Sequence, residues 1–189
     1  PSPEEEFKMF RRVVESSGRP MVFTCNQRHD GRGTFWRDLM AFAREARDDG
    51  HILRPVVAPR PIGVMLGLNG SQNPFSGTPT YRSIEHLPLD QRVEAMSQTN
   101  IRAKILSEDP VKQSTFPLIH RILFTQMFRL GSPANYTPSP EESISAMAQN
   151  LGVTPQEMAY DILLENQGRE FLYAPLVNYA NYTMDACAE

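Results

Sequence analysis

The first sixty residues alternate between helical and extended patterns at about thirty residues per unit, and this alternation constrains the fold more than any other feature. Apolar residues spaced by three and four predict an amphipathic helix at 4–15. Uncharged, β-branched and aromatic residues predict a buried strand at 21–25, and Thr34 begins a second predicted helix. A further strand is predicted at 51–57. Strand, helix and strand in this order indicate a βαβ crossover, so we expect a helix-rich α/β fold with parallel strands.

The alternation stops after Ala58, where proline and glycine become frequent. The many apolar residues in this stretch favour an ordered excursion over a disordered linker. Later patterns predict helices at 89–96 and 100–108, and two more that begin with proline at 140 and 155. A third strand is predicted at 169–173.

Charge, hydropathy and cysteine content exclude several classes of protein. Nineteen Lys and Arg against 22 Asp and Glu give a formal net charge of −3, which disfavours a nucleic-acid partner. No stretch approaches the roughly 18 apolar residues of a membrane span, and no signal peptide is recognisable, so no membrane partner is expected. Cys25 and Cys187 fit reduced thiols better than a disulfide framework, which predicts a cytoplasmic protein.

The sequence contains no pattern that announces catalysis or metal binding. Neither HxH nor HExxH occurs, and the four histidines are isolated from one another. Gly31 and Gly33 precede a helix but lack the third glycine of a dinucleotide fingerprint. Cys25 ends the first predicted strand, where active-site residues gather, yet no base lies nearby and a small buried side chain is the favoured interpretation. We therefore expect no catalytic residue and no metal ligand in this chain.

Three residues are candidates for substrate binding. Arg60 lies between two prolines at the end of a predicted strand, where rigid neighbours would fix its guanidinium for a bidentate contact with a carboxylate. A structural salt bridge is the alternative interpretation of Arg60. Asn26 and Gln27 directly follow the first predicted strand, where parallel folds place pocket walls. The aromatic residues of the loop at 73–81 either line a pocket or pin the loop to the body of the protein.

Several runs resemble the N-acyl-D-amino-acid deacylases (D-aminoacylases) of the amidohydrolase superfamily. The similar runs are RPMVFTCNQ at 19–27, RPIGVMLGL at 60–68, NPFSGTPTY at 73–81, LPLDQRVEAM at 87–96, YTPSPEESISAMAQNLGVTPQEMAYDILL at 136–164 and LVNYANY at 176–182. The resemblance spans nearly the whole chain, and long runs in one order are more specific than a short motif.

The resemblance implies a partial (β/α) barrel segment of a TIM-barrel amidohydrolase with a largely helical insertion. Late barrel βα units are expected at 1–58, an inserted Pro/Gly-rich and helical excursion at 59–135, and a helical segment that returns to the barrel at 136–189. It further implies hydrolysis of N-acyl-D-amino acids to a D-amino acid and a carboxylate. In this family, zinc and a late aspartate activate the attacking water.

The resemblance also implies that this chain begins after the last histidine ligand and stops before the catalytic aspartate. We expect an internal fragment that is inactive alone and binds no cofactor itself, with zinc held by the full-length parent. Arg60, Asn26 and Gln27 would contribute to the pocket for the small-molecule substrate. Strands cut from a barrel expose unpaired edges, so self-association of the fragment is expected. The alternative hypothesis is a self-standing α/β module that binds a ligand or partner through the loop at 73–81 without catalysis.

Overall fold

The structure is a computed structural model, and it describes residues 3–28, 34–109 and 124–189. The chain divides into two compact units. Unit 1 comprises Pro1–Ile62 and Leu176–Glu189, and unit 2 comprises Gly63–Pro175. The described residues form many helices and two small sheets, which confirms the helix-rich α/β class, and their strands close no barrel.

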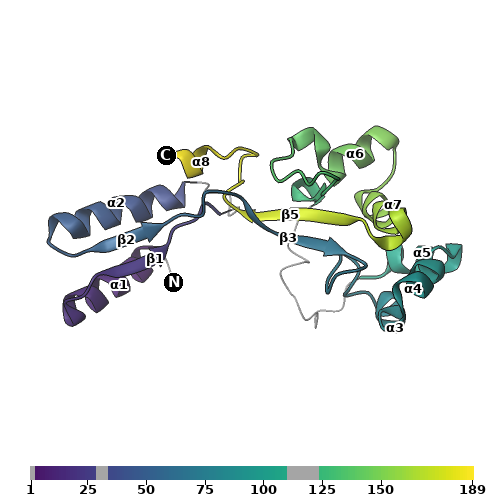
Figure 1. The fold of residues 1–189 in the computed structure, drawn as a ribbon, viewed down its shortest axis with the longest axis horizontal. Helices are drawn as coiled ribbons and strands as arrows, with labels where there is room; N and C mark the ends of the chain where they lie inside the picture. Colours follow the sequence, from purple (N-terminus) through teal and green to yellow (C-terminus); the bar gives the residue numbers. More distant parts are fainter. Residues whose placement is uncertain (1–2, 29–33, 110–123) are drawn as a thin grey trace. The chain divides into compact units, whose positions relative to one another are not determined.

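Unit 1 contains the βαβ crossover that the sequence predicts. Its elements are α1 (Pro3–Ser17), β1 (Met21–Thr24), α2 (Phe35–Asp48), β2 (Leu53–Val56) and the short α8 (Asp185–Ala188), all labelled in Figure 1. β1 and β2 are parallel, with Met21 opposite Leu53 and Thr24 opposite Val56. Pro55 lies within β2. Because β2 is an edge strand of this two-stranded sheet, the missing N–H of proline interrupts no ladder with another described strand.

The core of unit 1 lies on one face of this parallel sheet. Phe23 of β1 and Leu53 of β2 are buried with apolar residues of both long helices. The ring of Phe7 on α1 stacks on that of Phe42 on α2, with centroids 5.1 Å apart. Because side chains alternate along a strand, Val22 and Val56 point to the opposite face, where they are 62% and 53% exposed.

Unit 2 is built on a second sheet in the order β3-β5-β4. Its strands are β3 (Ile62–Gly67), β4 (Phe128–Arg129) and β5 (Phe171–Val177), and β5 pairs antiparallel with β4. The sequence did not predict β3, because Gly63 and Gly67 interrupt its apolar pattern. β5 also extends past the predicted end at 173.

The two glycines of β3 allow β5 to approach closely. A Cβ at position 63 would lie 2.5 Å from the carbonyl oxygen of Ala174, and a Cβ at position 67 would lie 2.6 Å from the ring of Phe171. Since position 63 meets 174 and position 67 meets 171, the two strands run in opposite directions. Close packing therefore requires glycine at both positions, and the two glycines make the strand hard to predict from the sequence.

Helices of unit 2 surround a single apolar core. They are α3 (Pro79–Ile84), α4 (Leu89–Met96), α5 (Thr99–Ser107), α6 (Ile144–Leu151) and α7 (Pro155–Gly168). Three predicted helices are confirmed, with ends that differ by at most a few residues: those at 89–96 and 100–108, and the one that begins at Pro155. The helix predicted from Pro140 begins instead as a 3-10 turn, Pro140–Glu142, and α6 follows after the cap residue Ser143. α7 loses helical geometry at Glu165.

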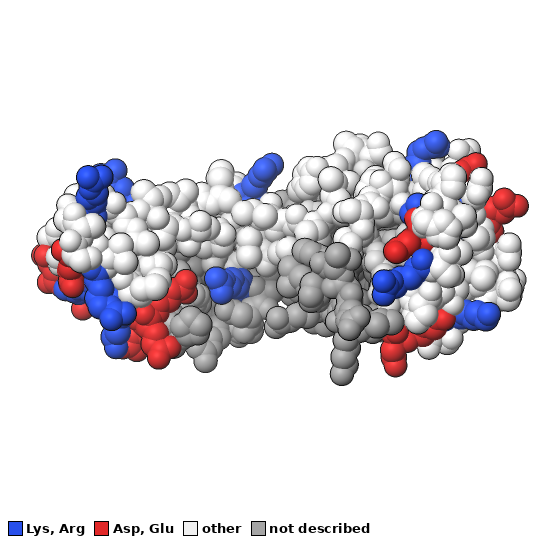
Figure 2. All heavy atoms as spheres, turned by 90° about the horizontal axis from the view of Figure 1, so that it is seen from below, with Lys and Arg blue, Asp and Glu red and all other residues white. Residues whose placement is uncertain are grey.

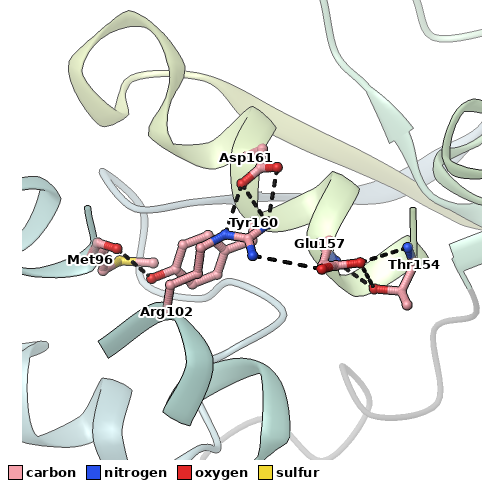
Figure 3. A network of polar contacts seen from close by, with 6 residues as sticks. All are labelled: Met96, Arg102, Thr154, Glu157, Tyr160 and Asp161. Atoms are coloured by element: carbon pink, nitrogen blue, oxygen red, sulfur yellow. Dashed lines mark hydrogen bonds and ion pairs between the residues drawn. The ribbon is translucent and has the colours of Figure 1, made fainter. Parts of the chain in front are cut away.

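A polar network joins three helices of unit 2 (Figure 3). The guanidinium of Arg102 lies 5.6 Å from the ring centroid of Tyr160 and pairs with Asp161 at 3.2 Å and with Glu157 at 3.7 Å. The Tyr160 hydroxyl donates a 2.8 Å hydrogen bond to the carbonyl oxygen of Met96, at the end of α4. α5, α7 and α4 are thus held together by one buried ring and its polar neighbours.

The surface carries both signs of charge. On the face drawn in Figure 2, basic and acidic side chains are interspersed and neither forms a continuous field. None of the helices in the described part of the chain combines the length and apolar character that a membrane crossing requires.

Candidate functional site

Asn178 connects two segments at the carboxyl ends of the parallel strands of unit 1. Its side-chain Oδ1 accepts a 2.9 Å hydrogen bond from the backbone N–H of Gln27, and its own backbone N–H donates to the Gln27 carbonyl at 2.8 Å. Its Nδ2 donates to the carbonyl oxygen of Ala58 at 3.0 Å, and to the Arg60 carbonyl and the Asn26 Oδ1 at 3.4 Å. We call these five residues the Asn178 junction.

The local conformation suits asparagine at this position. Asn178 has φ of +64°, in the left-handed region that asparagine tolerates better than most residues. The side chain is 1% exposed, so its amide must find partners inside the protein, and the junction supplies them. The neighbouring Gln27 is also buried, and its Oε1 accepts a 3.0 Å hydrogen bond from the N–H of Ala180. Both side chains are therefore fixed.

The junction lies where open parallel sheets usually build their sites. Asn26 and Gln27 follow the end of β1, and Ala58 and Arg60 follow the end of β2. The carboxyl ends of parallel strands meet at one edge of the sheet, and loops from that edge commonly carry binding residues. The structure thus brings together the three residues that the sequence singles out.

The three predicted residues differ in what they offer a ligand. Arg60 joins the junction through its carbonyl oxygen, and its exposed guanidinium has no ion-pair partner among the residues that the structure describes. Gln27 is buried and its side chain holds the backbone at Ala180, so it positions the segment. Asn26 is half-buried and also lines a neighbouring cavity.

That cavity, which we call the β1 cavity, has a volume of about 350 Å³ and belongs to unit 1. It lies beside the carboxyl end of β1, with walls from α1, from the start of α2 and from the end of β5. Its described lining residues are Glu6, Phe10, Phe23, Thr24, Asn26, Arg28, Phe35, Leu39 and Val177.

Cys25 is a structural thiol. It is 1% exposed, its Sγ lies 3.7 Å from the carbonyl oxygen of Trp36, and burial raises the pKa of the thiol. A nucleophilic cysteine needs the opposite shift, toward thiolate at neutral pH. The interpretation of Cys25 as a small buried side chain is confirmed.

The described residues do not assemble a metal site. Within 3–28, 34–109 and 124–189, no three His, Cys, Asp or Glu side chains lie close enough together to hold an ion.

The aromatic residues of the loop at 73–81 pin it to unit 2. Phe75 and Tyr81 are 4% and 3% exposed and belong to the apolar core, and the ring of Phe75 meets that of Tyr160 with centroids 5.2 Å apart. Asn73 is buried and caps the turn by accepting a 2.9 Å hydrogen bond from the N–H of Phe75. These side chains are not available to a partner.

Sequence reasoning did not identify Asn178 or the two charged residues of the β1 cavity, Glu6 and Arg28. Asn178 does carry a signal, because a polar residue directly after the apolar end of a strand occupies the same kind of position as Asn26. Glu6 resembles any acidic residue in the first turn of a helix, and the sequence offers nothing that separates it from its neighbours.

The chain matches no protein-family model, no curated protein and no solved structure.

Proposed function

We propose that this chain is part of a metal-dependent amidohydrolase that hydrolyses N-acyl-D-amino acids to a D-amino acid and a carboxylate. In this proposal the βαβ crossover of unit 1 belongs to a (β/α) barrel, and the Asn178 junction forms part of the wall of its substrate pocket. The chain alone is inactive, because the groups that activate water lie elsewhere in the parent protein.

The observation that carries the proposal is the Asn178 junction itself. A buried asparagine ties the loop after β1 to the loop after β2, which supports a pocket wall at the carboxyl edge of the parallel sheet. The backbone of Arg60 belongs to this wall, and its guanidinium has no ion-pair partner in the described structure. An exposed guanidinium held on a fixed backbone suits bidentate binding of a substrate carboxylate.

The uncovered face of the β1–β2 sheet adds support. Parallel sheets are normally covered on both faces, yet Val22 and Val56 are more than half exposed. Among the described strands, β1 and β2 pair only with each other, so each has an open edge. Further barrel strands would cover this face and these edges, and without them the isolated chain is expected to self-associate there.

In this proposal, zinc is held by other parts of the parent protein. The described residues include no group of three metal ligands, so the metal is assigned to other parts of the parent. What this chain supplies is binding and orientation of the carboxylate end of the substrate.

The test is a hydrolysis assay on two proteins: the 189-residue chain, and the longest gene product that contains it. We expect the longer protein to release D-amino acid from N-acetyl-D-amino acids in the presence of zinc, and the chain alone to release none. Absence of turnover by a folded, zinc-loaded longer protein would contradict the proposal. Turnover by the chain alone would contradict it as well.

The role of Arg60 is tested in the longer protein with a matched control. Arg60→Met removes the proposed carboxylate contact, and we expect KM to rise about tenfold or more with a smaller change in kcat. Arg44→Met removes an exposed arginine from the outer side of α2 and should leave both constants unchanged. Equal effects of the two substitutions would exclude Arg60 as the carboxylate ligand.

The alternative, a self-standing binding module, gains no support from the loop at 73–81, since Phe75 and Tyr81 are buried. If the chain does bind a ligand by itself, the β1 cavity is the better place to look for it.

A further inference from the structure

The β1 cavity has the composition of a small-molecule site. Ligand pockets are commonly a few hundred Å³ in volume, mostly apolar, with a small number of polar groups that orient the ligand. The β1 cavity holds about 350 Å³, and five of its nine described lining residues are apolar. Three phenylalanine rings, of Phe10, Phe23 and Phe35, come from three different elements and meet around it.

Two of these rings are held in place by the core. Phe10 and Phe23 lie with centroids 5.4 Å apart, and Phe23 also meets the ring of Phe7 at 6.2 Å. Phe35 and Leu39 lie one turn apart on α2 and so line the same side. The apolar wall is thus formed before any ligand enters.

The cavity also carries one acidic and one basic side chain. Glu6 is half-buried in the first turn of α1, and Arg28 is exposed beyond the end of β1. The described structure records no ion pair between the two, and neither side chain has another charged partner among the described residues. Both line one cavity, so a ligand that carries both charges can pair with each of them.

We propose that the β1 cavity binds a free amino acid with an apolar side chain, as the zwitterion. Arg28 takes the carboxylate, Glu6 takes the ammonium group, and the side chain packs against the three phenylalanine rings. Thr24 and Asn26 supply further hydrogen-bonding groups at the rim. The inference does not rest on the proposed hydrolase: a free amino acid carries an ammonium group that the N-acyl substrate lacks, and it belongs to the class of product that such a hydrolase would release.

The test uses the 189-residue chain and four probes. Phenylalanine, in both enantiomers, carries all three features, N-acetylphenylalanine lacks the ammonium charge, phenethylamine lacks the carboxylate, and glycine lacks the side chain. Binding is followed by calorimetry and by the fluorescence of Trp36, the single tryptophan, which directly follows Phe35. We expect at least one enantiomer of phenylalanine to saturate the protein with a Kd of about 1 mM or tighter, and each incomplete probe to bind about tenfold more weakly or worse.

Two substitutions locate the site. Glu6→Gln keeps the size of the side chain and removes its charge, Arg28→Gln replaces the guanidinium by a shorter neutral amide, and each should weaken phenylalanine binding about tenfold or more. Arg12→Gln on α1 and Glu94→Gln on α4 change exposed residues outside the cavity and serve as controls. All four variants are compared at equal folded fraction, measured by near-ultraviolet circular dichroism.

Saturable binding that requires both Glu6 and Arg28 supports the inference. It is overturned if phenylalanine does not saturate the protein, if N-acetylphenylalanine binds as tightly as phenylalanine, or if the control variants lose as much affinity as the cavity variants. None of these outcomes depends on hydrolysis, so this inference and the proposed function fail separately.

Discussion

Gln27 and Asn178, 151 residues apart in the sequence, exchange two hydrogen bonds across the carboxyl edge of the parallel sheet. The Gln27 N–H donates to the Asn178 side chain at 2.9 Å, and the Asn178 N–H donates to the Gln27 carbonyl at 2.8 Å. This pairing joins the segment Leu176–Glu189 to the first part of the chain within unit 1. Arg28 and Val177 continue it as an antiparallel bridge.

Asn178→Ala should destabilise unit 1 by about 2–4 kcal/mol, because it leaves the buried Gln27 N–H and Ala58 carbonyl without their partner and places alanine at positive φ. Urea unfolding followed by Trp36 fluorescence measures the change. Asn178→Gly keeps the backbone conformation and isolates the loss of the side chain. The matched control is Asn181→Ala, an exposed position, and a similar loss there would contradict the prediction.

Gly63→Ala should destabilise unit 2 by about 1–3 kcal/mol, because the new Cβ would meet backbone that has no room to move. It would lie 2.5 Å from the Ala174 carbonyl oxygen and 2.9 Å from the Pro175 Cα. Thermal unfolding and amide exchange in β3 and β5 report the effect. Gly70→Ala, whose nearest contact would be 3.4 Å, should be close to neutral, and equal losses at the two positions would refute the packing argument.

Tyr160 should make stability depend on pH in the alkaline range. Burial raises the pKa of Tyr160 from its ordinary value of 10.0 to about 12, while Arg102 opposes this shift. Between these values the unfolded chain loses the phenolic proton first, so the free energy of unfolding falls as pH rises from 10 toward 12. Urea unfolding at about pH 9 and about pH 11 measures the slope.

Tyr160→Phe should reduce that slope, and at neutral pH it should cost about 1–2 kcal/mol, because the Met96 carbonyl loses its donor. Tyr136→Phe changes a tyrosine that is 52% exposed and should leave the slope as it is. An unchanged slope in Tyr160→Phe would assign the alkaline loss of stability to other groups.

Cys25 should resist thiol reagents in the folded chain, because it is 1% exposed; burial raises the pKa of both Cys25 and Cys187, so the difference between them comes from access. Modification by Ellman's reagent should be at least about tenfold slower for Cys25 than for the half-buried Cys187. The Cys187→Ser and Cys25→Ser variants assign the two rates. In urea, the difference between the two modification rates should disappear. Comparable rates in the native protein would contradict the prediction and indicate a reactive Cys25.

Local pattern was enough to predict the βαβ crossover and most of the helices. The start of α7 illustrates why, since Thr154 and Glu157 cap each other's backbone three residues apart. Such a cap depends only on neighbours in the sequence. The same holds for the uncharged run of β-branched and aromatic residues in β1 and for the helical spacing of apolar residues in α2.

β3 shows where local pattern fails. Gly63 and Gly67 weaken its extended signature, and they are there because the carbonyl of Ala174 and the ring of Phe171 occupy the space of a side chain. The reason lies more than a hundred residues away along the chain. The candidate site follows the same rule, because Asn26, Gln27 and Arg60 were recognisable as strand-end residues but their common partner was not.

The sequence by itself determined most of the helices of this protein, its βαβ crossover, its helix-rich α/β class and the strand-end positions of three candidate binding residues. Tertiary structure alone decided that Asn178 would join those residues, that two glycines would admit β5 beside β3, and that Glu6 and Arg28 would line one cavity. Helical periodicity and caps act over a few residues, whereas hydrogen bonds, close packing and charge placement depend on distances that only the folded chain creates.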